Sequence, residues 1–369
     1  MIKVLHVTYD MRIGGTEMVI KNIIDGNSDR SIAMSIFCIE EPLGPWGEEL
    51  KKAGTDISTA HRQPGFDTSL IKSLRRHIER YDIDVVHCHQ YTPWVYGTLA
   101  ALFTKAKVIF TEHGRFYPDS TSWKRQLVNP VLMRATKKAT AISHATKDAL
   151  EEYEFIPKAR IDVIYNGIKP LEVDHTIKAI TKSELAIPEE SIVLGTIARF
   201  DPIKNQEMMI KAFSAALKEN QNLVLVLVGD GEMRPTLEAL VLKERIEDHV
   251  RFTGYIKDPS RYLAIMDIFL LSSLSEGTSM TLLEAMSLSK PCIVTDAGGN
   301  SEIVEHQQTG LVTENANQKA YTSAINTLCS SPMSIKEMGA NGYSVFCQKF
   351  NAKNMVAQYA HLYREITGR

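Results

Sequence analysis

Apolar runs with the length of buried strands alternate with amphipathic stretches of helical length along nearly the whole chain. In the first half, the strand-like runs cover residues 2–8, 32–39, 85–88 and 108–111, and the helical stretches cover 16–25, 68–80, 93–104 and 144–153. In the second half, the strand-like runs cover 192–197, 223–228, 250–253, 268–271 and 291–295. Regular alternation of this kind is typical of parallel sheets with helices on both faces, so we predict an α/β protein.

The alternation is interrupted between Asn166 and Pro188, where the chain is polar and has little strand character. A chain of 369 residues is long enough for two domains with separate cores. We therefore predict an N-terminal Rossmann-like domain over 1–168, a linker over 169–190 and a C-terminal Rossmann-like domain over 191–351.

Two glutamates, Glu276 and Glu284, stand eight positions apart around a run of mostly small residues that we expect to open a helix. At about 1.5 Å per residue, their carboxylates are expected roughly 12 Å apart, which is too far for one proton-transfer pair. The free N–H groups at a helix N-terminus suit a phosphate. The spacing fits a nucleotide-sugar, with sugar hydroxyls at one glutamate and ribose hydroxyls at the other. Two ordinary surface glutamates would show the same spacing.

Two loops after predicted strands add candidate ligand groups. Arg199 and Lys204 follow the strand 192–197, at the edge where parallel sheets bind ligands. Arg199 offers a planar fork for phosphate oxygens and Lys204 a mobile point charge, although a solvated loop would look the same. Gly229 begins a tight turn after the next strand, and its lack of a side chain leaves room for a nucleotide.

The motifs taken together resemble the retaining glycosyltransferases of the GT-B fold in glycosyltransferase family 4. The resemblance covers nearly the whole chain and depends on the order and spacing of its pieces, which are Gly14-Gly15-Thr16-Glu17, Thr111-Glu112-His113-Gly114, Ala141-Ile142-Ser143, Asn166-Gly167-Ile168, Arg199 with Lys204, Gly229-Asp230-Gly231, Phe252-Thr253-Gly254-Tyr255, Glu276 to Glu284, and Ala297-Gly298-Gly299-Asn300-Ser301-Glu302. It implies two Rossmann-like domains facing a deep cleft, the first on the acceptor side and the second binding the nucleotide-sugar. It also implies that a closing helix over 352–369 returns to the first domain.

The resemblance assigns a role to each matched residue. Glu276 would bind hydroxyls of the donor sugar, Glu284 would hold the ribose, and His113 would lie near the transferred sugar. Arg199 and Lys204 would bind the diphosphate. The other substrate-binding positions would act mainly through the main chain: Gly14 and Gly15 at phosphate and acceptor, Gly229 beside the nucleotide, Tyr255 and Ile256 at the base, and Gly277, Thr278, Ser279 and Met280 at the diphosphate. Thr278 often has a Phe or Leu counterpart in the family and Ser279 a Gly or Pro.

The implied reaction is retaining, metal-independent transfer from a nucleoside-diphosphate sugar, with a UDP-sugar as the expected donor. The expected acceptor is a hydroxyl of a glycan or lipid-linked molecule in cell-surface polysaccharide synthesis. Arg199, Lys204 and a helix N-terminus would stabilise the leaving diphosphate, so no cofactor is expected. A nonhydrolysing sugar-nucleotide epimerase and a non-catalytic sugar-nucleotide-binding protein remain as alternatives. A glucan phosphorylase would require pyridoxal phosphate.

Composition favours a cytoplasmic protein. The formal net charge of −2 gives no reason to expect nucleic acid as a partner. The five cysteines show no metal-ligand spacing, and neither a signal peptide nor an apolar run of membrane-spanning length is visible. His87 and His89 flank Cys88, but neighbours on one strand cannot chelate one ion together, so no metal site is predicted.

A basic region lies between Phe103 and Lys138. The region contains eight positively charged residues and two negatively charged ones. The positive residues are Lys105, Lys107, Arg115, Lys124, Arg125, Arg134, Lys137 and Lys138, and the negative ones are Glu112 and Asp119. Apolar residues recur at helical spacing within it, namely Trp123, Leu127, Val128, Val131 and Leu132, which indicates a basic amphipathic helix kinked near Pro130. We expect the apolar face to pack on its own domain. The alternative is peripheral contact with anionic lipid at the inner face of the membrane.

Overall fold

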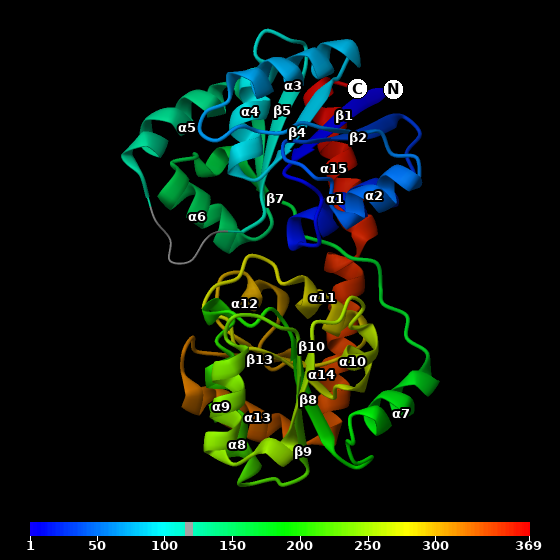
Figure 1. Ribbon diagram of the computed structural model, residues 1–369, viewed down its shortest axis with the longest axis vertical. Helices are drawn as coiled ribbons and strands as arrows, with labels where there is room; N and C mark the ends of the chain where they lie inside the picture. The colour runs from blue at the N-terminus through cyan, green and yellow to red at the C-terminus, as the bar shows by residue number, and fades with distance from the viewer. Residues whose placement is uncertain (115–120) are drawn as a thin grey trace. The chain divides into compact units, whose positions relative to one another are not determined.

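The computed structural model describes residues 1–114 and 121–369 and divides into two compact units (Figure 1). Unit 1 comprises Met1–Lys169 and Asn351–Arg369, and unit 2 comprises Pro170–Phe350. Arg115 and Asp119 of the basic region lie outside the described residues. No helix in the described part of the chain is long and apolar enough to cross a membrane.

Unit 1 contains a seven-stranded parallel sheet with the strand order β3-β2-β1-β4-β5-β6-β7. Its strands are β1 Ile2–Thr8, β2 Ile32–Cys38, β3 Ile57–Thr59, β4 Val85–His89, β5 Lys107–Glu112, β6 Thr136–Ala141 and β7 Ile161–Val163. Its helices are α1 Gly15–Gly26, α2 Pro45–Lys52, α3 Thr68–Arg80, α4 Tyr91–Ala101, α5 Trp123–Ala135, α6 His144–Glu154 and α15 Ala352–Thr367, with a short 3-10 turn at Lys158–Arg160. The last helix of the chain, α15, packs against α1 and β1 of this unit.

Unit 2 contains a six-stranded parallel sheet with the order β10-β9-β8-β11-β12-β13. Its strands are β8 Ile192–Ile197, β9 Leu223–Val228, β10 Val250–Gly254, β11 Ile268–Leu271, β12 Cys292–Thr295 and β13 Gly310–Thr313. Its helices are α7 His175–Glu184, α8 Gln206–Leu217, α9 Arg234–Glu244, α10 Ser260–Ile265, α11 Met280–Ser287, α12 Asn300–Ile303, α13 Gln318–Cys329 and α14 Pro332–Val345, followed by a π-helical turn at Phe346–Phe350. Two 3-10 turns lie at Pro202–Lys204 and Glu247–His249.

The core of unit 2 explains the continuous apolar runs in its sequence. Every residue of β9 is buried, because helices cover both faces of a parallel sheet and leave neither face to water. Leu223, Leu225 and Leu227 of this strand share one core with Phe213 of α8 and Tyr321 of α13. This packing fixes where the strands end, and therefore where the loops at their carboxyl ends begin.

The structure confirms the α/β fold with two parallel sheets and corrects some details. The segment 169–190, which we expected to be a linker, carries helix α7, which packs against α10 in unit 2. Strand β6 was missed because its sequence, Thr-Lys-Lys-Ala-Thr-Ala, contains no large apolar residue. Its burial comes from its neighbours in the sheet, β5 and β7, which the local pattern does not record.

Candidate active site

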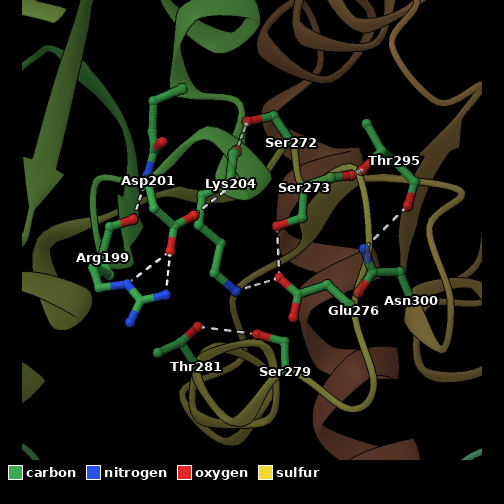
Figure 2. Close-up of polar contacts among 11 residues, drawn as sticks. Arg199, Asp201, Lys204, Ser272, Ser273, Glu276, Ser279, Thr281, Thr295 and Asn300 are labelled. Carbon is green, nitrogen blue, oxygen red and sulfur yellow. Dashed lines mark hydrogen bonds and ion pairs between the residues drawn. The ribbon is translucent and has the colours of Figure 1, made fainter. Parts of the chain in front are cut away.

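Two loops at the carboxyl edge of the unit 2 sheet bring predicted site residues into contact. Lys204 lies in the loop after β8, and Glu276 lies in the loop after β11. Because β8 pairs with β9 on one side and with β11 on the other, the order of the strands reverses here, and open α/β sheets bind ligands at such a point. The Lys204 Nζ atom lies 2.6 Å from Glu276 Oε1 (Figure 2).

The carboxylate of Glu276 is held by more than the lysine. Ser273 Oγ donates a second hydrogen bond to the same oxygen, Oε1, at 2.6 Å. The other oxygen, Oε2, has no hydrogen-bond partner within the described residues. The side chain of Glu276 is 9% exposed and that of Lys204 is 25% exposed, so the pair is only partly screened by water. The arrangement leaves one oriented carboxylate oxygen free to accept a hydroxyl.

Buried hydroxyls tie the two loops together beneath this pair. Ser272 Oγ donates to the carbonyl oxygens of Lys204 and Asn205 at 2.8 and 3.0 Å. Thr295 Oγ1, at the end of β12, donates to the carbonyl oxygen of Ser273 at 2.6 Å (Figure 2). Asn300 Nδ2 in turn donates to the carbonyl oxygen of Thr295 at 3.1 Å. Three strand ends therefore determine where Lys204 and Glu276 meet.

A glycine is required behind the backbone of Glu276. Gly298 has φ +56°, and a Cβ atom there would lie 1.8 Å from the carbonyl oxygen of Glu276. The next residue, Gly299, donates its N–H to the same carbonyl at 3.3 Å. A side chain at position 298 would therefore displace the main chain that carries the Glu276 carboxylate.

Arg199 lies beside this pair without joining it. Its guanidinium contacts Asp201 Oδ2 through Nε at 2.7 Å and through Nη2 at 2.6 Å. Asp201 Oδ1 accepts the N–H of Lys204 and so begins the 3-10 turn that positions the lysine. The Arg199 side chain is 75% exposed, and an ion pair so exposed contributes little stability, about 0–1 kcal/mol. Its guanidinium can therefore turn toward an anion at small energetic cost.

The loop after β9 supports the main chain of Arg199. Gly229 has φ +140°, and a Cβ atom there would lie 2.0 Å from the carbonyl oxygen of Ala198. Phe200 donates its N–H to the carbonyl oxygen of Asp230 at 2.9 Å. The glycine is therefore explained by close contact of two loops, while its proposed approach to a nucleotide stays a prediction.

Helix α11 begins later than the sequence suggests. It starts at Met280, so Glu276 and Gly277 to Ser279 precede it in extended or turn conformation. The expected separation of the two glutamates assumed one continuous helix and does not apply. Ser279 Oγ contacts Thr281 Oγ1 at 3.1 Å and does not cap the helix, so no side chain of Ser279 occupies the first N–H groups. An anion is the natural partner for them.

Glu284 lies within α11 and is mostly buried. Burial, and to a smaller extent the negative charge of Asp258, raise the pKa of its carboxyl to about 7. Asp258 stands in the loop after β10, which also carries Tyr255 and Ile256, so this loop lies near the Glu284 carboxyl. Tyr255 is 64% exposed. The residues predicted to bind ribose and base therefore share one neighbourhood.

His113, in unit 1, is the end of a chain of three imidazole rings. His113 Nε2 lies 2.8 Å from His89 Nδ1, and His89 Nε2 lies 2.9 Å from His6 Nδ1. In each contact one nitrogen donates and the other accepts, so all three neutral rings must adopt the same tautomer. The two end atoms, His113 Nδ1 and His6 Nε2, are buried and have no hydrogen-bond partner among residues 1–114 and 121–369. Burial lowers the pKa of His6 and His113 to about 3 and that of His89 well below its usual value.

The histidines also bear on the metal prediction. Ring nitrogens of His6, His87 and His89 lie within 4.8 Å of one another, so His6 supplies the neighbour from a second strand that the sequence argument overlooked. Both nitrogens of His87 are engaged, with Tyr363 Oη at 2.8 Å and Thr111 Oγ1 at 2.6 Å. An ion would have to replace these contacts and the His6–His89 contact. The prediction of no metal remains a prediction.

The predicted site residues are divided between the two units. His113, Gly14 and Gly15 belong to unit 1, and the other predicted residues belong to unit 2. Gly14 precedes α1 with φ −166°, an ordinary extended conformation. Sequence reasoning did not assign roles to Asp201, Ser273 or Thr295, which position the predicted side chains. For Asp201 and Ser273 a signal existed, because each is a polar residue close behind an apolar strand and beside a predicted site residue.

Comparison with known proteins places this geometry in a class. Residues 178–345 match the family model for glycosyl transferases group 1, and residues 13–170 match the model for glycosyltransferase family 4. The structure of Anabaena Alr3699/HepE in complex with UDP superposes with a TM-score of 0.87 at 20% identity, covering 99% of this chain and 100% of the other. The chain is a glycosyltransferase of the GT-B fold. It belongs to family 4, as its motifs predicted.

Curated relatives are similar at lower than 30% identity. The N-acetyl-alpha-D-glucosaminyl L-malate synthase of Bacillus anthracis is 26% identical over 310 residues, which cover 82% of this chain and 80% of the relative. The O-antigen biosynthesis glycosyltransferase WclY of Escherichia coli is 23% identical over 373 residues, which cover 99% of this chain and 98% of the relative.

We predict that Gly298→Ala lowers the rate of sugar transfer by about 100-fold, because the added methyl group displaces the main chain of Glu276. Gly54→Ala is the matched control, since Gly54 also has a positive φ but nothing lies within 4 Å of its added Cβ. Steady-state kinetics and thermal unfolding of both variants check this. Equal losses of activity in the two variants would show that backbone strain, and not displacement of Glu276, is responsible.

We also predict that unit 1 loses stability between pH 7.5 and 5.5. The unfolded histidines take up protons below about pH 6.5, whereas His6 and His113 stay neutral in the fold until about pH 3. Stability is therefore present above the unfolded pKa and is lost as the pH falls, by about 1.4 kcal/mol for each buried histidine over this interval.

Urea unfolding followed by tryptophan fluorescence measures this loss, because Trp46, Trp94 and Trp123 all belong to unit 1. His6→Asn should reduce the loss by about 1.4 kcal/mol. His361→Asn, at an exposed position, should not reduce it. A free energy of unfolding that stays constant from pH 7.5 to 5.5 would contradict the prediction.

Proposed function

We propose that this glycosyltransferase transfers a sugar from a UDP-sugar to a hydroxyl of a glycan or lipid-linked acceptor in cell-surface polysaccharide synthesis, with retention at the anomeric carbon and without a metal ion. The observation that carries the proposal is the Lys204–Glu276 pair at the point where the strand order of unit 2 reverses. The UDP complex of HepE supports the choice of nucleotide, and the O-antigen role of WclY supports the choice of pathway.

The donor fits along three features of unit 2, which are the Glu284 carboxyl, the start of α11 and the Glu276 carboxylate. Ribose hydroxyls bind the Glu284 carboxyl, the diphosphate lies at the start of α11, and sugar hydroxyls bind Oε2 of Glu276. Lys204 and Arg199 supply positive charge to the departing diphosphate. The stabilisation that they provide increases as negative charge develops on the leaving group. Two such cations can do the work that a divalent ion does in other transferases, which is why we propose a metal-independent reaction.

Glu276 is better suited to orient the sugar than to attack it. Its Oε1 is occupied by Lys204 and Ser273, and these contacts lower the nucleophilicity of the carboxylate. We therefore propose that the acceptor hydroxyl attacks the face from which the diphosphate departs, with no covalent sugar–enzyme intermediate. His113, kept neutral by burial, would hydrogen-bond the transferred sugar through Nδ1, which has no partner in the described part of the chain.

The acceptor and the location complete the proposal. By its name, the Bacillus anthracis relative is a synthase of N-acetyl-alpha-D-glucosaminyl L-malate, so a test of acceptors includes small hydroxy acids beside lipid-linked glycans. We propose that the enzyme works in the cytoplasm, at the inner face of the membrane. A nonhydrolysing epimerase would instead change UDP-glucose alone into another sugar nucleotide, and a binding protein would leave it unchanged.

We predict that the affinity for UDP-glucose rises about tenfold from pH 6 to pH 8. In the protein without ligand, the pKa of the Glu284 carboxyl is about 7. The ribose hydroxyls donate hydrogen bonds best to the ionised carboxylate, so the ionised fraction of Glu284 determines the affinity. Calorimetric titration measures this. Glu284→Gln should weaken binding and remove the pH dependence, while Glu219→Gln, at an exposed position, should preserve both. An affinity that does not change with pH in the wild type would contradict the ribose assignment.

We further predict that Lys204→Ala slows the release of UDP from UDP-glucose by about 100- to 1,000-fold, because it removes charge from the leaving group and leaves Glu276 unpaired. Lys211→Ala removes an exposed surface ion pair and is the control. Proton NMR of the first glucose released should show the α anomer, and EDTA should not change the rate. Release of the β anomer would overturn the proposed retention, and a loss of activity in EDTA would overturn metal independence.

A further inference from the structure

Helix α5 exposes four of its large apolar side chains to solvent. Trp123, Leu127 and Val131 are 69%, 64% and 59% exposed, and their four-residue spacing aligns them in one stripe along the helix. Val128 beside them is 44% exposed. Our expectation that this apolar face packs on its own domain is therefore wrong for these four residues, whereas Leu132, 6% exposed, packs in the core of unit 1 as expected. We call these four residues the α5 stripe.

A polar network on the opposite side fixes this orientation. Asn129, fully buried, donates to the carbonyl oxygen of Glu154 at 2.9 Å and to its Oε2 at 3.0 Å, and accepts from Tyr91 Oη at 2.8 Å. Arg125 Nη1 lies 2.6 Å from Glu154 Oε1. Turning the helix to bury the stripe would leave these polar groups without partners, and each buried polar group without a partner costs about 1–3 kcal/mol. The position of α5 beside α6, which ends at Glu154, is visible in Figure 1.

Positive charge borders the stripe. Helix α5 contains no acidic residue, and Lys124 and Arg134 on it are exposed and form no ion pair within the described residues. Lys124 Nζ lies 6.0 Å from the centre of the Trp123 ring. Among the other cations of the basic region, Lys105 pairs with Asp82 and Asp84 and Lys138 pairs with Asp162, whereas Lys107 on β5 and Lys137 on β6 form no ion pair within the described residues. The unpaired positive charge of α5 itself, on Lys124 and Arg134, lies on the same helix as the exposed apolar side chains.

We propose that the α5 stripe docks on an anionic lipid surface, with Trp123, Leu127 and Val131 entering the head-group region and Lys124 and Arg134 contacting lipid phosphates. An exposed tryptophan and aliphatic residues flanked by basic side chains are the pattern of a helix lying in a membrane interface. A second copy of the chain fits less well, because it would bring Lys124 and Arg134 against like charges. The inference deepens the proposed function, since the lipid would present the acceptor, but its test needs no sugar.

The test uses vesicles of phosphatidylglycerol and phosphatidylcholine, with pure phosphatidylcholine for comparison. The full-length protein should sediment with the anionic vesicles, and Leu127→Glu/Val131→Glu should reduce the partition constant more than tenfold. Leu242→Glu is the matched control, because Leu242 in α9 is 63% exposed and lies in unit 2. Lys124→Ser/Arg134→Ser should weaken binding about 25-fold, at about fivefold for each charge near an anionic surface.

Fluorescence locates the contact. Trp123 is exposed while Trp94 is fully buried, so anionic vesicles should shift the tryptophan emission to shorter wavelength. The shift should disappear in Trp123→Phe, a variant that still sediments with the vesicles. Every substitution is at an exposed position, and circular dichroism should match that of the wild type.

Three results would overturn the inference. They are wild-type protein that does not sediment with anionic vesicles, Leu127→Glu/Val131→Glu that binds them as well as wild type, and a dimer in solution that the same double variant converts to monomer. The thermal shift caused by UDP-glucose is measured on every variant. If UDP-glucose did not raise the melting temperature of the wild type, only the donor proposal would be contradicted, because vesicle binding is measured without nucleotide.

Discussion

The meeting of Lys204 and Glu276 is the contact on which the site in unit 2 depends. Lys204 and Glu276 lie on two different loops. The two charges come into contact because β8 and β11 are adjacent parallel strands that end at the same edge of the sheet. Ser272, Ser273 and Thr295 then hold the two loops at fixed distance through buried hydrogen bonds. A site built in this way is oriented before substrate arrives, so little binding energy is lost in ordering it.

The same principle explains the glycines that the family motifs contain. The absence of a side chain at Gly298 leaves room for the carbonyl group of Glu276, and the absence of one at Gly229 leaves room for the carbonyl group of Ala198. In both places the chemistry resides in a neighbouring loop, and the glycine allows that loop to come close. The glycines of these motifs are therefore explained by close contact between neighbouring loops as much as by the proposed contact with a nucleotide.

Polar groups buried in unit 1 determine the orientation of what surrounds them. The chain of His113, His89 and His6 restricts three rings to one common tautomer, and Asn129 with Glu154 sets the rotation of α5. In each case the cost of an unpaired buried polar group is larger than the gain from a different arrangement. That cost keeps four apolar side chains of α5 in water, where a lipid surface can reach them.

The sequence by itself determined the fold class and the family, and it supplied the donor-site residues of unit 2 as predictions. Strand and helix periodicity is a local property, and motifs such as Glu276 to Glu284 keep their spacing along the chain. Tertiary structure alone decided the start of α11, the pairing of Lys204 with Glu276, the linkage of the histidines and the outward face of α5. These depend on which strands are neighbours and which polar groups are buried together. Such relations join residues far apart in sequence, and periodicity carries no record of them.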